Sequence, residues 1–194
     1  YNPSKKTEVV GSFAKADEDI ARKTLDTALA TFETWKFETP EKRASYLFKA
    51  AEIMRRRGLE LDSWLVFEVG KSWAEADGDI AEAIDFLEFY GREALGYGGE
   101  QPLTRYPGEK DELRYIPLGV GLVVPPWNFP MAIPSWKLFP ALTCGNTAVI
   151  KPATLTPASV HEFVSALAEA GVPPGVVNIV YGGGSAVGEA LLQH

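Results

Sequence analysis

Three short apolar runs between residues 120 and 180 restrict the folds that are open to this chain. They are Val120–Val124, Thr147–Ile150 and Val176–Val180, and a helix-length segment separates each from the next. Apolar strands that alternate with helices are typical of a parallel sheet covered on both faces. The pattern predicts an α/β fold in which an N-terminal helical segment packs on a Rossmann-like parallel sheet with βα repeats.

The residues before the first run are predicted to be helical. From Asp17 to about Gly96 apolar residues recur at helical spacing, and one helix is expected to begin at Thr39-Pro40-Glu41 and end at Gly58. Turn residues dominate after Gly96, with Leu113–Ile116 as a candidate strand. The expected division is a helical region over residues 1–96, connecting turns and a short strand over 97–117, and the first half of a dinucleotide-binding sheet over 118–194.

Charge and cysteine content narrow the class of protein. The net charge is -7, and no basic run is longer than Arg55–Arg57, so we expect neither a nucleic-acid nor a membrane partner. No apolar run approaches the roughly 18 residues that span a bilayer. The single cysteine, Cys144, excludes an internal disulfide and suits a reducing compartment, so a cytoplasmic location is expected. We expect its thiol to be buried or half-buried and not a nucleophile.

Ligand sites in parallel sheets lie at the carboxyl ends of the strands. After the first strand comes Pro125-Pro126-Trp127-Asn128-Phe129-Pro130, a loop stiffened by three prolines. An asparagine amide aimed by such a loop is a neutral donor for a developing oxyanion, a role worth roughly 10² to 10³ in rate. The alternative is an ordinary proline-rich turn in which Asn128 bonds its own backbone.

The next two strand ends carry weaker signals. Lys151 follows the second strand, where it would hold a ribose hydroxyl or a phosphate, or simply be a solvated lysine that closes the strand. The third strand leads into Tyr181–Gly188, a glycine cluster that opens a helix and suits a pyrophosphate. The spacing is not the usual dinucleotide pattern after a first strand, so a plain flexible turn is the alternative. His161 and His194 form no metal-ligand cluster with Cys144, and no metal is expected.

Taken in order along the chain, the three strand-end loops and the segments between them resemble the aldehyde dehydrogenase family, and the resemblance covers nearly the whole chain. The upstream motif Glu68-x-Gly70-Lys71 also fits. The resemblance implies NAD(P)-dependent oxidation of an aldehyde to a carboxylic acid. The matching segments are Pro117–Gly121, Pro126–Pro130, Trp136-Lys137, Pro140–Leu142, Gly145–Thr147, Lys151-Pro152 and Pro174–Asn178.

The resemblance also implies roles for individual residues. Asn128 would donate to the oxyanion, Phe129 would line the aldehyde channel, and Lys137 matches a lysine thought to assist proton relay. Lys151 would bind the adenosine ribose hydroxyls. Many NAD-preferring members carry glutamate where this chain has Thr154, so NAD and NADP both remain open as cofactor. The cofactor contacts implied are Val124, Pro125, Pro126, Trp127, Asn128, Lys151, Ala153, Thr154, Gly184 and Gly188.

Two motifs of the family do not occur here. The family nucleophile is a cysteine in Gly-Gln-x-Cys and its base a glutamate in Glu-Leu-Gly-Gly, and both are expected downstream. Cys144 lies in a helix–strand connection and does not replace that cysteine. We therefore expect the chain by itself to be inactive. The competing hypotheses are a non-catalytic dinucleotide-binding fragment and an unrelated doubly wound protein whose loops match by chance.

Within the family, one branch matches best. Glu68–Asp77, Ile84–Tyr90 and Tyr106–Glu109 resemble the branch that oxidises glutamate γ-semialdehyde, the 1-pyrroline-5-carboxylate dehydrogenases of proline catabolism. The alternative substrate is another semialdehyde, such as succinate semialdehyde. The resemblance implies a small-molecule aldehyde as substrate and a homo-oligomer at full length.

Overall fold

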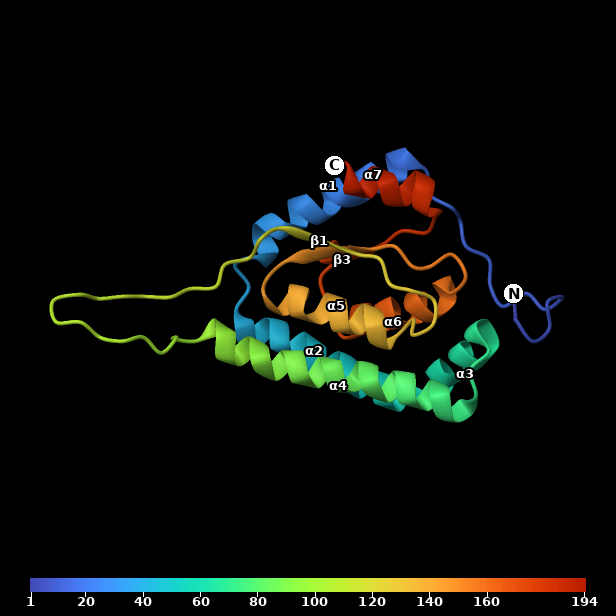
Figure 1. Cartoon of the computed structure of the whole chain (residues 1–194), viewed down its shortest axis with the longest axis horizontal. Helices are drawn as coiled ribbons and strands as arrows, with labels where there is room; N and C mark the ends of the chain where they lie inside the picture. Colours follow the sequence, from blue (N-terminus) through green and yellow to red (C-terminus); the bar gives the residue numbers. More distant parts are fainter.

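The computed structural model describes residues 1–194, and its centre is a three-stranded parallel sheet (Figure 1). The strands are β1 (Val120–Val123), β2 (Thr147–Ile150) and β3 (Val177–Ile179), in the order β1-β2-β3. Val120 lies opposite Thr147, and Ala148 opposite Val177. The three predicted strands and their parallel arrangement are confirmed.

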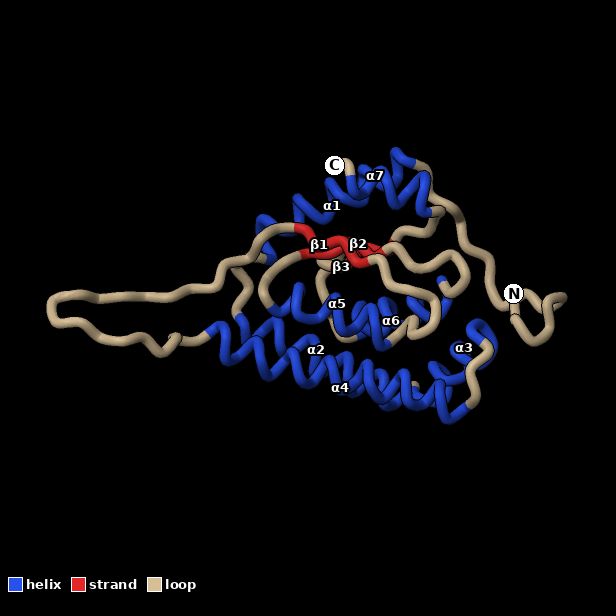
Figure 2. Tube along the Cα trace, in the orientation of Figure 1, coloured by secondary structure: helices blue, strands red, loops and turns tan.

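Helices cover both faces of this sheet, as Figure 2 shows. Helices α5 (Ala132–Thr143) and α6 (Pro157–Glu169) connect the strands and lie on one face. Helix α1 (Glu18–Trp35) covers the other face together with the short C-terminal helix α7 (Glu189–Leu192). All four residues of β2 are buried, which explains why three of them are apolar, and the hydroxyl of the fourth, Thr147, donates a hydrogen bond of 2.9 Å to the carbonyl oxygen of Ala28.

A second layer of helices packs outside α5 and α6. It contains α2 (Pro40–Arg56) and α4 (Trp73–Gly98), with α3 (Gly58–Val69) at one end (Figure 1). The helix predicted from Thr39 does begin there, but it ends at Arg56, and Gly58 opens α3 instead of closing α2. No helix of the chain combines the length and apolarity needed to cross a membrane.

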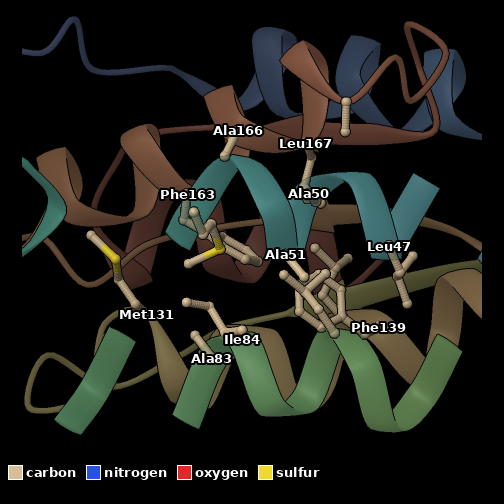
Figure 3. Packing of buried hydrophobic residues seen from close by; sticks show 14 of the residues in the cluster. Leu47, Ala50, Ala51, Ala83, Ile84, Met131, Phe139, Phe163, Ala166 and Leu167 are labelled. Atoms are coloured by element: carbon tan, nitrogen blue, oxygen red, sulfur yellow. The ribbon is translucent and has the colours of Figure 1, made fainter. Parts of the chain in front are cut away.

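One hydrophobic cluster of 27 buried residues joins the helical layer to the sheet (Figure 3). Alanines of α2 and α4 are prominent in it, because small side chains let two helices approach closely. Phe139 of α5 and Phe163 of α6 meet in the middle, with ring centroids 5.4 Å apart. A smaller cluster of eight buried residues lies on the opposite face, beneath α1 and α7. The sheet is therefore anchored from both sides.

Residues 99–118 form an arm that leaves the body of the molecule (Figure 1). The strand predicted at Leu113–Ile116 is wrong, since these residues have no regular structure and pair with no strand. The physical reason is that a strand requires a neighbour for its backbone groups, and the arm runs too far from the sheet to have one.

Candidate functional site

Three loops follow the three strands and meet at one edge of the sheet. They span residues 124–131 after β1, 151–156 after β2 and 180–188 after β3. Because the strands are parallel, their carboxyl ends lie on the same side (Figure 2). Every site residue predicted from the sequence except Lys137 lies in one of these loops.

The loop after β1 presents Asn128 to solvent. Pro125 and Pro130 are buried and fix its two ends, and the four residues between them are exposed. The Asn128 amide forms no hydrogen bond with the loop or with any other residue. The alternative of an asparagine that bonds its own turn is therefore wrong. The loop holds an amide donor with no partner inside the protein.

Two charged residues from the helical layer support this loop. Asp79 of α4 is 0% exposed, and its Oδ1 accepts a hydrogen bond of 2.7 Å from the backbone N–H of Ala132, the first residue of α5. Its Oδ2 accepts from Nζ of Lys71 at 2.8 Å. Burial raises the pKa of Asp79, against the opposing effects of Lys71 and the backbone amides. Nζ of Lys71 also lies 3.9 Å from the centroid of the Phe129 ring.

The sequence motifs included Lys71 without a role in the site, and they did not include Asp79. A signal was present, because Asp79 falls on the apolar stripe of α4 that contains Ala76, Ile80 and Ala83. A charged residue at such a position is buried and needs a partner.

Lys151 at the end of β2 is buried, with 5% of its surface exposed. Its Nζ donates to the carbonyl oxygens of Pro152 at 3.1 Å and Gly182 at 3.5 Å, and it forms no ion pair. Burial lowers the pKa of this ammonium group. The alternative of a solvated lysine is therefore wrong. Gly188 lies against the Lys151 side chain, where an added Cβ would be 3.6 Å from Cε.

Glu68 of α3 holds the far end of the Lys151 loop. It is 7% exposed, and its carboxylate accepts hydrogen bonds from Ala158 N at 2.8 Å, Ser159 N at 2.7 Å and Ser159 Oγ at 2.6 Å. These groups belong to the first turn of α6, where backbone amides lack partners within the helix. Glu68 therefore caps a helix about 90 residues away in sequence, a role that the sequence motifs did not reveal.

The loop after β3 leads into a π-helical turn, Gly184–Gly188, which continues directly into α7. Gly183 and Gly184 are exposed, and a Cβ added at either would meet no atom within 4 Å, so a ligand can approach their backbone closely. Before them, the Tyr181 hydroxyl lies 2.8 Å from Nδ1 of His161. Burial and the nearby Glu162 and Glu68 carboxylates raise the pKa of Tyr181 to about 12.

A cavity of about 280 Å³ lies beside the second and third loops. Two of the predicted cofactor residues, Ala153 and Thr154, line it, together with Phe13 and Tyr181. A larger hollow of about 1050 Å³ is enclosed by the arm, but it contains none of the predicted site residues. The smaller cavity is therefore the better ligand candidate.

The remaining predicted residues lie further out. Lys137 is exposed on α5, with its Nζ 5.3 Å from the centroid of the Trp136 ring, and no hydrogen bond links it to Asn128. Val124 and Trp127 are exposed in the first loop. Cys144 is exposed as well, so the expectation of a buried thiol is wrong: the residue follows the last turn of α5, outside its packed face.

These features fit a ligand rich in hydroxyl and phosphate groups. Lys151 is a buried cation that faces only carbonyl oxygens, and the third loop, which contacts its side chain, also carries two glycines with open backbone. Lysine side chains and glycine-rich turns are the groups that hold ribose and pyrophosphate oxygens in dinucleotide sites.

Comparison with known proteins decides the family. The model of the aldehyde dehydrogenase family matches residues 1–194, which is the whole chain. The chain belongs to the aldehyde dehydrogenase family. The family resemblance inferred from the loop motifs is thereby confirmed.

Among aldehyde dehydrogenases, the 1-pyrroline-5-carboxylate dehydrogenases are close relatives. Those of Geobacillus kaustophilus and Anoxybacillus flavithermus are each 50% identical to this chain over 193 residues. The match covers 100% of this chain and 38% of each relative. The chain therefore spans little more than a third of the length of these relatives.

Solved aldehyde dehydrogenase structures share the fold. A 1-pyrroline-5-carboxylate dehydrogenase from Thermus with bound NAD superimposes with a TM-score of 0.96 at 46% identity, covering 100% of this chain and 38% of that one. Proline utilization A from Bdellovibrio bacteriovorus gives a TM-score of 0.97 at 39% identity, covering 100% of this chain and 20% of that one. The α/β fold expected from the sequence is that of the matching region of these enzymes.

Proposed function

We propose that the protein containing these residues oxidises glutamate γ-semialdehyde, the open-chain form of 1-pyrroline-5-carboxylate, to glutamate. The observation that carries the proposal is the unpartnered Asn128 amide on a rigid loop at the same sheet edge as the buried Lys151. The relatives at 50% identity, which are 1-pyrroline-5-carboxylate dehydrogenases, support the choice of aldehyde over another semialdehyde such as succinate semialdehyde.

In this proposal Asn128 donates a hydrogen bond to the oxygen of the aldehyde as negative charge develops on it. A neutral donor fixed by its loop stabilises this oxyanion without having to reorganise during the reaction. Phe129 lines the path of the aldehyde, and Lys137 assists proton relay. Residues 1–194 contain neither the Gly-Gln-x-Cys nor the Glu-Leu-Gly-Gly motif of the family, so in this proposal the nucleophile and the base belong to another part of the protein.

The cofactor in the proposal is NAD or NADP, which accepts the hydride. Lys151 donates to the ribose hydroxyls, and the glycines of the third loop leave room for the pyrophosphate. Thr154 carries no charge that would repel a 2′-phosphate, so we expect both cofactors to bind. The proposed cofactor contacts are Val124, Pro125, Pro126, Trp127, Asn128, Lys151, Ala153, Thr154, Gly184 and Gly188.

The test is Asn128→Ala in the complete gene product, with 1-pyrroline-5-carboxylate as substrate and NAD and NADP titrated separately. We expect kcat to fall roughly 10²- to 10³-fold, the usual cost of losing one oxyanion donor, while the KM for the cofactor stays within about twofold. Gln193→Ala removes another exposed amide and should leave both constants unchanged. An unchanged kcat in Asn128→Ala would refute the role of Asn128.

A second proposal concerns residues 1–194 expressed alone. The absence of the family's Gly-Gln-x-Cys and Glu-Leu-Gly-Gly motifs favours a non-catalytic dinucleotide-binding fragment. Such a chain should form no NADH in response to aldehyde.

For the complete protein we propose a homo-oligomer in the cytoplasm. Analytical ultracentrifugation would test the oligomeric state.

A further inference from the structure

We propose that Lys71 and Asp79 are positioning residues for the loop that carries Asn128 and Phe129. The inference rests on the proposed function and deepens it. It adds two residues of the helical layer, neither of which the sequence motifs placed in the site, to the set that controls how the aldehyde is held.

The first anchor acts on the backbone at the end of the loop. Asp79 is 0% exposed, and both of its carboxylate oxygens are used, Oδ1 by the N–H of Ala132 and Oδ2 by Nζ of Lys71. A carboxylate at the first turn of a helix also interacts favourably with the helix dipole. Asp79 therefore fixes where α5 begins, and with it the point at which the loop must end.

The second anchor acts on a side chain. Nζ of Lys71 lies 3.9 Å from the centroid of the Phe129 ring, well inside the range of a cation–π interaction, and the Lys71 side chain is only 10% exposed. Phe129 remains 40% exposed, so one side of its ring faces Lys71 while another is open to a ligand. Asn128 precedes Phe129 directly, and Phe129 O accepts from Ile133 N at 3.2 Å.

Together the two anchors clamp the short segment between Asn128 and Ala132. Asp79 holds Lys71 in place, and Lys71 holds the ring. Without the cation, the ring is free to change its rotamer in the space where the aldehyde would lie. The expected consequence is a loss of kcat/KM for the aldehyde with little change in cofactor binding, because Lys151 and the glycines, which are proposed to hold the ribose and the pyrophosphate, belong to the other two loops.

The test is a double-mutant cycle in the complete gene product, using Lys71→Met, Phe129→Leu and the double variant with NAD and 1-pyrroline-5-carboxylate. Lys71→Met should lower kcat/KM for the aldehyde about tenfold, within the range expected for a desolvated cation–π contact. The KM for NAD should change less than twofold. In the Phe129→Leu background the same change should have almost no further effect, because the ring on which Lys71 acts is gone.

Two further variants separate positioning from folding. Lys71→Arg keeps a cation over the ring and should retain at least a third of the activity. Lys71→Met combined with Asp79→Asn leaves no unpaired carboxylate, and the new amide oxygen at position 79 still accepts a hydrogen bond from the N–H of Ala132. This double variant should therefore fold, and its kcat/KM for the aldehyde should be as low as that of Lys71→Met. The matched control is Lys36→Met, because Lys36 also lies beside aromatic rings and a glutamate but far from the loop.

Additive losses in the cycle, or a kcat/KM within twofold of wild type in Lys71→Met, would overturn the inference. If the wild-type protein does not oxidise 1-pyrroline-5-carboxylate, the proposed function fails separately. The coupling is then measured in the same cycle as non-additivity of the opening free energies of the first turn of α5, from amide hydrogen exchange. Additive free energies would reject the clamp, and non-additive ones would support it.

Discussion

The buried carboxylate of Glu68 offers a prediction whose size follows from three hydrogen bonds. In Glu68→Gln the amide oxygen can keep the two Ser159 bonds, but the amide nitrogen then faces the Ala158 N–H, donor against donor. One unsatisfied buried N–H costs about 1–3 kcal/mol, and two charge-assisted bonds that become neutral lose about 1 kcal/mol each at most. The loss of charge at the helix dipole adds a few tenths. The total is about 3 kcal/mol.

The assay is amide hydrogen exchange of the peptide that covers α6, because a local measurement avoids the multistep unfolding of a large enzyme. A loss of about 3 kcal/mol in the opening free energy predicts exchange roughly 100-fold faster in the first turns of α6. Asp17→Asn is the control, since Asp17 caps α1 from an exposed position and asparagine caps equally well. An acceleration below about fivefold in Glu68→Gln would show that Glu68 does not support α6.

Two further predictions concern a turn and a tyrosine. Gly175 has φ +86°, and a Cβ there would clash with Oγ1 of Thr31, so Gly175→Ala should lower the opening free energy of the surrounding backbone by about 2 kcal/mol or more in amide hydrogen exchange. Gly78→Ala, in an open position of α4, should instead raise it by up to about 1 kcal/mol, and equal effects of the two changes would contradict the assignment. The pKa of Tyr181 is raised from 10.0 to about 12, so between these pH values the folded state keeps the phenol proton that the unfolded state has lost. The stability contributed by the protonated Tyr181 is therefore lost as the pH rises from 10.0 to about 12. Tyr181→Phe should flatten this fall in stability, and an unchanged slope would argue against a raised pKa.

Local patterns predicted the elements of the fold well. The strands β1, β2 and β3 followed from continuous apolar runs, and the start of α2 followed from a capping threonine and a proline. Which face of a helix is buried was harder to predict. Ile20 and Leu29 matched the helical spacing of α1, yet both are exposed, because α1 packs on the sheet through Ala21, Leu25 and Ala28.

The candidate site also has features that the sequence predicted and features that it did not. The order of strands and loops was sufficient to predict that Asn128, Lys151 and Gly184 lie at one edge, since parallel strands place their ends together. The burial of Lys151 was not predictable, because it depends on the third loop folding over the lysine stem. The prediction of a strand at Leu113–Ile116 was wrong because it also depended on tertiary structure: no neighbouring strand is there to pair with these residues.

The sequence by itself predicted the βα order and the strand ends as the place of the candidate site, and its motifs indicated the family to which the chain belongs. All of these depend on residues that are near one another along the chain. Only the tertiary structure decided that Glu68 caps α6 and that Asp79 and Lys71 brace the Asn128 loop. These contacts join segments about 50 to 90 residues apart. A charge on an apolar helix face indicates that it needs a partner, but its partner is chosen by how the helices pack.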